Sequence, residues 1–324
     1  MKKIQLLFML ILYGFTINCS QDPDSSTALT VEEEKEVGAY IRTVTIEDSE
    51  FHIGGTNNVF KTVLEVQDEE DGDLFDEIEV YLKFKDNTPD NGDNSVDELF
   101  LKTLERSVFE MGPFDLPRSP LEISQQEAFE LLNLNETSIS CKDQFLVRLN
   151  LKLGDGREIT TGQSSSKIIA FDDFWSSPFC YTINVVESID PASFLGTYTM
   201  TSISNTELPP SFGEQLQIEI TQGHAPNIRE MRLRHRFSIL QEQPRIFRFT
   251  VACDNTIFGK NLLASKIAFC GVDPAILMGP DEENGQADDE DDSVFELWFV
   301  EGYLGFDGNC GFGTVPVKYR FSKQ

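Results

Sequence analysis

The sequence predicts an all-β protein of two domains, with one short helix in the first. Three observations lead to this prediction. Apolar and polar residues alternate with a period of two, the alternating runs are short and end at turn residues, and no helical segments are interspersed between them. Such a pattern favours β-sandwiches or barrels over a parallel sheet, which needs crossover helices. Hydrophobic residues make up 40% of the 324 residues, and 26 of them are Phe, so both domains have material for packed cores.

The start of the chain has the features of an export signal. Two lysines precede the apolar run "IQLLFMLILYGFTI", which is shorter than the roughly 20 residues of a transmembrane helix. The run ends at Cys19, as in a bacterial lipoprotein box, although Asn18 replaces the usual small residue. We therefore predict a lipoprotein signal peptide over residues 1–18, a lipid on Cys19 and a flexible tether over 19–35. The alternative is a secreted protein in which Cys19 forms a disulfide.

The charge of the chain restricts its partners. The formal net charge is −29, and removing residues 1–18 takes away two lysines and no acid, which leaves −31. Nucleic acids and anionic lipid surfaces both require a cationic face, so they are excluded as default partners. A lipid-modified cysteine would instead hold the protein on a membrane through its acyl chains, because each buried methylene contributes about 0.8 kcal/mol.

The first domain is expected over residues 36–188. Alternation predicts strands in "AYIRTVTI", "NVFKTVLEV" and "DEIEVYLKFKD", and a hairpin in "DQFLVRLNLKLGDGREIT", which turns at Gly154–Gly156. Ser124 and Glu127 fit a capping box and precede an apolar stripe, so a short helix should begin there.

The second domain is expected over residues 189–324, as a β-sandwich or a lipocalin-like barrel. Asp190-Pro191 interrupts two strand patterns and indicates the boundary. Beyond it, five alternating segments predict strands: "QLQIEIT", "EMRLRHRFSIL", "RIFRFTVAC", "VFELWFVEG" and "VPVKYRFSKQ".

Five cysteines besides Cys19 suggest disulfides, because exported proteins retain them. We predict the pairs Cys141–Cys180 and Cys270–Cys310, with pairs that use Cys253 as the alternative in the second domain. An odd count leaves one thiol over. A zinc site is not expected, because the chain has no CxxC and three histidines.

An acidic loop before one of the predicted strands is a candidate calcium site. "DEENGQADDEDDS" concentrates carboxylates, and calcium takes six to eight oxygen ligands. The residues to test are Asp288, Asp289, Asp291 and Asp292. The spacing is not that of an EF-hand, and the alternative is a solvated loop.

Basic and aromatic residues offer two further candidate sites. On a strand, Arg232, Arg234 and Arg236 would share a face, which could bind an anionic sugar, a phosphate or an acidic protein; the alternative is an outer face paired with carboxylates. Trp175 and Trp298 are candidates for stacking on a sugar, with core packing as the alternative.

No catalytic motif is present. The sequence lacks a G-x-S-x-G elbow, a phosphate-cradling glycine loop and H-E-x-x-H, so a non-enzyme is expected and no cofactor other than possible calcium. A hydrolase using a carboxylate pair stays open, because spacing in sequence does not give separation in space.

Most of the chain resembles surface lipoproteins of Bacteroidetes-type bacteria, and among these the accessory lipoproteins of SusC/SusD-like nutrient importers. The resemblance depends on the start of the chain with Cys19 and "SQDPD", and on "CKDQFLVRLNLKLGDGRE", "SSPFCYTINVV" and "FLGTYT". It implies an outer-membrane, cell-surface location and an Ig-like first domain, but transfers no binding residue. The function expected from it is non-catalytic capture of a glycan or nutrient, or assistance to such an importer. A surface hydrolase and a structural or adhesion lipoprotein are the alternatives.

Overall fold

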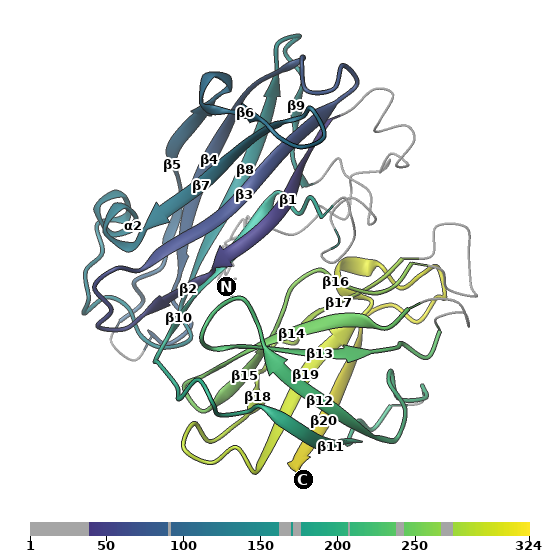
Figure 1. Ribbon diagram of the computed structural model, residues 1–324. Helices are drawn as coiled ribbons and strands as arrows, with labels where there is room; N and C mark the ends of the chain where they lie inside the picture. Colours follow the sequence, from purple (N-terminus) through teal and green to yellow (C-terminus); the bar gives the residue numbers. More distant parts are fainter. Residues whose placement is uncertain are drawn as a thin grey trace, which may run out of the picture.

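The computed structural model describes residues 39–89, 92–161, 170, 176–206, 208–237, 243–266 and 275–324 (Figure 1). Cys19, Trp175 and Cys270 lie outside these ranges, as do the predicted signal peptide and tether. The described part of the chain is all-β with one short α-helix, which confirms the predicted fold class. Within that part, no helix combines the length and the apolar content that crossing a membrane requires.

The first domain consists of two sheets. One sheet has the order β1-β3-β7-β6 and the other β2-β10-β8-β4-β5, with β9 paired to β8. The helix α2 follows β7 and lies at one end of the domain (Figure 1). The elements are β1 (Ala39–Asp48), β2 (Glu50–His52), β3 (Val59–Asp68), β4 (Phe75–Lys85), β5 (Val96–Glu105), β6 (Glu110–Met111), β7 (Pro117–Ser124), α2 (Gln125–Leu132), β8 (Gln144–Leu153), β9 (Glu158–Ile159) and β10 (Cys180–Val186).

The core of the first domain lies between the two sheets. The alternate apolar residues of β4, from Ile78 to Phe84, are fully buried, as their spacing predicted. Phe60 of β3 packs across the core against Tyr181 of β10, with ring centroids 5.5 Å apart. Each such side chain contributes roughly 1.5–3 kcal/mol when it leaves water, so the interleaved faces hold the two sheets together.

The predicted capping box starts the helix. The Ser124 hydroxyl accepts a hydrogen bond from the backbone N–H of Glu127 at 3.1 Å. The helix ends at Asn133, whose φ of 54° lies in the left-handed region that commonly ends helices. A short helix beginning at this capping box was predicted from the sequence, and the structure confirms it.

The second domain is a single ten-stranded antiparallel sheet with the order β16-β17-β19-β20-β11-β12-β13-β14-β15-β18. Its strands are β11 (Gly196–Ser202), β12 (Gln215–Gln222), β13 (Ile228–Leu233), β14 (Arg245–Ala252), β15 (Asn255–Phe258), β16 (Leu262–Ser265), β17 (Ile276–Pro280), β18 (Gly285–Gln286), β19 (Val294–Glu301) and β20 (Val315–Lys323).

This sheet curls into a half-barrel. β15 comes back against β19, where the Thr256 hydroxyl donates to the backbone oxygen of Glu296 at 2.6 Å. Gly285 of β18 allows this approach, because a Cβ at that position would lie 2.1 Å from the same oxygen. The sequence left a sandwich and a barrel open for this domain, and the curled single sheet is closer to the barrel.

The two domains have separate cores. The buried apolar residues of the first run from Ala39 to Val185, and those of the second from Ile189 to Phe321. The chain crosses between the cores over a few residues after β10.

A disulfide between Cys141 and Cys253 joins the domains, with their Cα atoms 6.0 Å apart. The predicted Cys141–Cys180 pair is therefore wrong. Cys141 lies beside the end of β10, since its sulfur accepts from the N–H of Glu187, whereas Cys180 begins that strand. The two cysteines therefore lie at opposite ends of β10. At about 3.3 Å per residue, the length of this strand exceeds the distance that a disulfide can span. Cys180 and Cys310 are also disulfide-bonded, and Cys270, the predicted partner of Cys310, lies outside the described residues.

Candidate functional site

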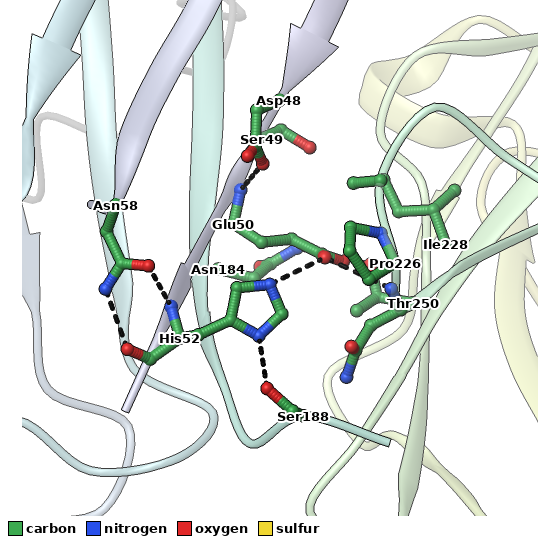
Figure 2. Close-up of polar contacts among 12 residues, drawn as sticks. Asp48, Ser49, Glu50, His52, Asn58, Asn184, Ser188, Pro226, Ile228 and Thr250 are labelled. Atoms are coloured by element: carbon green, nitrogen blue, oxygen red, sulfur yellow. Dashed lines mark hydrogen bonds and ion pairs between the residues drawn. The ribbon is translucent and has the colours of Figure 1, made fainter. Parts of the chain in front are cut away.

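A buried carboxylate organises the contact between the domains (Figure 2). Glu50 of β2 is fully buried, and its Oε2 accepts a hydrogen bond from the backbone N–H of Asn227 in the second domain at 3.2 Å. The same oxygen lies 3.6 Å from Nε2 of His52. Hydrogen bonding to Glu50 raises the pKa of His52, and this outweighs the lowering by burial.

Asn227 completes this junction from the second domain. Its side-chain amide donates to the backbone oxygen of Glu187 at 2.7 Å and to that of Val251 at 2.8 Å. One fully buried side chain thus ties the connection between the domains to β14. Together with the Cys141–Cys253 disulfide, this network fixes the first domain against the β13–β14 face of the half-barrel.

A cavity of about 510 Å³ lies at this contact and has walls from both domains. That volume falls within the range of small-molecule sites, roughly 300–1,000 Å³. The lining of the first domain comes mainly from β1 and β10, and that of the second from β13, β14 and the β15–β16 turn. The polar side chains of the lining are Thr43, Thr45, Ser49, Gln144, Ser176, Tyr181, Thr182, Asn184, His224, Glu230, Arg248, Thr250 and Lys260.

Hydroxyl and amide groups form part of this lining. Asn184 of β10 accepts from Gln144 at 3.0 Å and donates across the contact to the hydroxyl of Thr250 at 3.4 Å. The Ser49 hydroxyl lies 3.1 Å from Nε2 of His224, which again joins the two domains. Such groups orient a polar ligand, because each presents a donor or acceptor in a fixed direction.

The cations of the cavity differ in their partners. Arg248 donates through Nε to the carboxylate of Glu230 at 2.7 Å on the neighbouring strand. Lys260 lies in the turn between β15 and β16, and no ion pair or hydrogen bond of its ammonium is found with any described residue. Burial lowers the pKa of Lys260 to about 8, and the nearby charge of Lys85 adds to this effect.

The pKa of His224 is shifted in the opposite direction from that of His52. Burial lowers its pKa to about 4, and the positive charge of Arg248 contributes in the same direction. The ring is therefore neutral at physiological pH and serves as a hydrogen-bonding group of the cavity wall.

Comparisons with known proteins leave the function open. No protein-family model matches the chain, and a search of curated proteins finds no match. Among solved structures, the chain is similar to the crystal structure of Spo0M, a sporulation control protein from Bacillus subtilis, at 12% identity over 88% of this chain and 90% of that chain. The TM-score is 0.22, which is too low to carry an inference about this protein.

The arginines that the sequence predicted to share a face have different surroundings. β13 ends at Leu233, so the strand alternation does not extend to Arg236. Arg232 and Arg234 are exposed, whereas Arg236 makes two hydrogen bonds of 2.7 and 2.8 Å to the buried carboxylate of Glu301. Arg236 is therefore engaged with Glu301, and none of the three arginines lines the cavity.

Glu301 is the centre of a buried polar cluster. Besides Arg236, it accepts from the hydroxyl of Ser211 at 2.6 Å, and its Oε1 lies 3.0 Å from Nε2 of His235. Burial alone would raise the pKa of Glu301, but His235 and Arg236 lower it below its usual value. Because its members are buried or half-buried and bonded to one another, this cluster stabilises the half-barrel and offers no open binding surface.

Trp298 lies on the outer face of β19, as its alternation with apolar neighbours predicted. Its indole N–H donates to Glu296 at 3.0 Å, and the ammonium of Lys318 lies 3.5 Å from the ring centroid. A cation thus occupies one face of the ring and competes there with a stacking sugar. Trp175, the other candidate, lies outside the described residues.

The aspartates of the acidic loop before β19 contact different partners. Asp292 accepts from the backbone N–H of Phe194 at 2.7 Å and pairs with Lys323, while Asp291 accepts from the N–H of Ser293 at 2.9 Å. The backbone of Asp288 bridges that of Asp291, and the N–H of Asp289 donates to Asp254 at 3.3 Å. No three Asp, Glu, His or Cys side chains gather as metal ligands within the residues that the structure describes.

The residues of the cavity were largely missed by sequence reasoning. None of Arg248, Lys260 and His224 was among the candidate site residues named from the sequence. A weak signal existed for Lys260, since it lies in a short turn between the apolar pairs "IF" and "LL", where a charged residue is unusual. For Asn184, Thr250 and Ser49 no local signal existed, because their role depends on how the two domains meet.

Proposed function

We propose that the protein is a non-catalytic lipoprotein of the outer membrane that captures a small polar ligand in the cavity between its two domains. The observation that carries this proposal is the cavity itself, to whose walls both domains contribute polar side chains. Anchoring through Cys19 would hold this site at the cell surface, next to a SusC/SusD-like importer that could accept the ligand.

The chemistry of the lining supports binding over hydrolysis. A glycosidase of the usual kind needs two carboxyl groups about 5–10 Å apart. Within the described lining, Glu230 is the single carboxylate, and it is paired with Arg248. The remaining polar groups are hydroxyls, amides, a neutral histidine and a lysine, which suit recognition of a hydroxylated molecule.

The rigidity of the junction also supports capture. The Cys141–Cys253 disulfide and the Glu50–Asn227 hydrogen bond hold the two walls in place before any ligand arrives. A site that is already ordered loses less conformational entropy on binding, so a small ligand can be held with few contacts.

A cavity-filling substitution tests the site of capture. The soluble fragment 20–324 would be applied to a glycan array, followed by calorimetry with the glycans that bind. Thr182→Trp should abolish binding, because Thr182 lines the cavity. Thr103→Trp, on β5 and away from the cavity, is the matched control and should bind as the unmodified fragment does. Binding that survives Thr182→Trp would refute capture at this site.

The anchor and the importer require separate tests. Mass spectrometry of the native protein should show a diacyl or triacyl group on Cys19 as the first residue, and an unmodified start would contradict the lipoprotein assignment. Purification of the tagged protein from native membranes should recover an importer of the SusC/SusD type. Turnover of any bound glycan by the purified fragment would instead establish a hydrolase.

A further inference from the structure

Two cations line the cavity among the described residues, and Arg248 is paired with Glu230 whereas Lys260 has no carboxylate partner there. Its turn is fixed to the sheet by the hydrogen bond from the N–H of Gly259 to the backbone oxygen of Arg248, at 2.9 Å. The lysine is half-buried against the first domain, near enough to Lys85 of β4 for the two charges to interact. An ammonium removed from water and set beside another cation is unfavourable unless an anion neutralises it.

The other charged residues of the described lining do not supply that anion. Glu230 is the one carboxylate of the described lining, and it is bonded to Arg248 at 2.7 Å. His224 is neutral, so it brings no compensating charge. This arrangement is unusual for a protein with a net charge of −29, in which carboxylates outnumber cations about two to one.

The remaining walls present hydroxyl and amide groups at short range. Thr182, Asn184 and Thr250 lie on facing strands of the two domains, and Ser49 and His224 close one side. Groups of this kind match the alternating donors and acceptors of sugar hydroxyls. Apolar side chains between them, including Ile228 and Phe258, match the C–H faces of a ring.

We infer that the ligand of the cavity is a carboxylated sugar of the uronic-acid type, whose carboxylate pairs with Lys260 while its hydroxyls bond to the facing strands. The inference depends on the proposed function, because it names the class of ligand that the same cavity captures. Lysine, a compact charge with three rotatable donors, can accept a carboxylate in several orientations of the ring.

Matched pairs of ligands test this inference. Glucuronate would be compared with glucose, and galacturonate with galactose, in calorimetric titrations of the detergent-solubilised full chain; an array of acidic oligosaccharides and their carboxyl-reduced forms extends the comparison. The acid of each pair should bind at least tenfold more tightly than its neutral counterpart. Lys260→Met should remove this preference, Lys260→Arg should retain most of it, and Lys61→Met, outside the cavity lining, should leave it unchanged.

A proton measurement separates a direct contact from a structural role. Pairing with a carboxylate raises the pKa of a lysine, so a titration at about pH 8.5 should take up protons, seen as a dependence of the binding enthalpy on the buffer. Lys260→Met should show none. Within the part of the chain that the structure describes, the other charged or titratable groups around this position are Lys85, Tyr181, His224, Glu230 and Arg248.

The possible results distinguish this inference from the function it depends on. Equal binding of neutral and acidic members of each pair would overturn the inference and leave capture in the cavity intact. No binding of any array glycan, acidic or neutral, would overturn both. Acid preference that persists in a folded Lys260→Met variant, checked by its melting temperature, would place the carboxylate elsewhere and overturn the inference as well.

Discussion

Cys141 and Cys253 lie 112 residues apart in the sequence and belong to different domains, yet they form one disulfide. The first precedes β8, and the second sits in the tight turn between β14 and β15, where it has a positive φ of 58°. The bond therefore crosses the contact that encloses the cavity. Because the disulfide holds the two domains together, the stability of the whole molecule depends on their relative position.

Replacing both cysteines, as Cys141→Ser with Cys253→Ser, should lower the free energy of unfolding by about 2–4 kcal/mol, because the unfolded chain regains the freedom of a long loop. Urea unfolding under non-oxidising, non-reducing conditions measures this loss. The connection at Ser188 should also become easier to cleave by a protease. Either single variant should lose a similar amount of stability, and an unchanged unfolding midpoint in the double variant would contradict the structural role of the bond.

Arg236 and Arg232 should respond very differently to substitution by alanine. Arg236→Ala removes the guanidinium that makes two hydrogen bonds to the buried carboxylate of Glu301, and breaking such a pair costs about 3–5 kcal/mol. Arg232→Ala, at an exposed position of β13, is the matched control and should change the free energy of unfolding by no more than about 0.5 kcal/mol. Similar small effects for both variants would mean that the Glu301 cluster does not hold the half-barrel together.

The strands that alternate clearly were predictable from sequence, and those with other patterns were not. β4 and most of β19 bury alternate residues, and β8 alternates apolar with polar residues along most of its length, so the period-two patterns of these strands were visible. β16 and β17 are buried on both faces and show continuous apolar runs instead. β5 is an edge strand whose apolar residues are spaced as on a helix, and its pairing with β4 overrides that local pattern.

The candidate site was harder to predict than the fold, for a physical reason. Thr182, His224 and Lys260 lie on three separate segments and meet because the domains pack in one particular way. Local sequence determines local structure, but it contains no record of which loop of one domain faces which strand of another. The disulfide pairing was wrong for the same reason, since Cys141 was matched within its own domain.

The pKa of His52 should depend on Glu50. Glu50→Gln keeps an acceptor for Asn227 but removes the charge, so the pKa of His52 should fall from its raised value towards or below 6.5, as measured by NMR titration of the ring. Asp48→Asn is the control and should cause a smaller fall, because Asp48 contributes least of the groups that raise it. Because the pKa of His52 is raised in the folded protein, the protonated ring stabilises the fold at pH below 6.5. This contribution is lost as the pH rises through the raised pKa. An unchanged pKa of His52 in the Glu50→Gln variant would contradict the contact between these two side chains.

His224 should make the protein less stable in mild acid. The unfolded chain binds a proton at this residue below about pH 6.5, whereas the folded protein binds it near pH 4, so stability falls as the pH drops through that window. The loss should approach about 1.4 kcal/mol per pH unit at most. His224→Gln should remove this contribution, so that its unfolding free energy, measured in urea at several pH values, declines less steeply than that of the unmodified protein. His52→Gln should instead make this decline steeper, since it removes a group that stabilises the folded protein at acidic pH. Parallel pH profiles for His224→Gln and the unmodified protein would mean that the ring is not buried in the cavity wall.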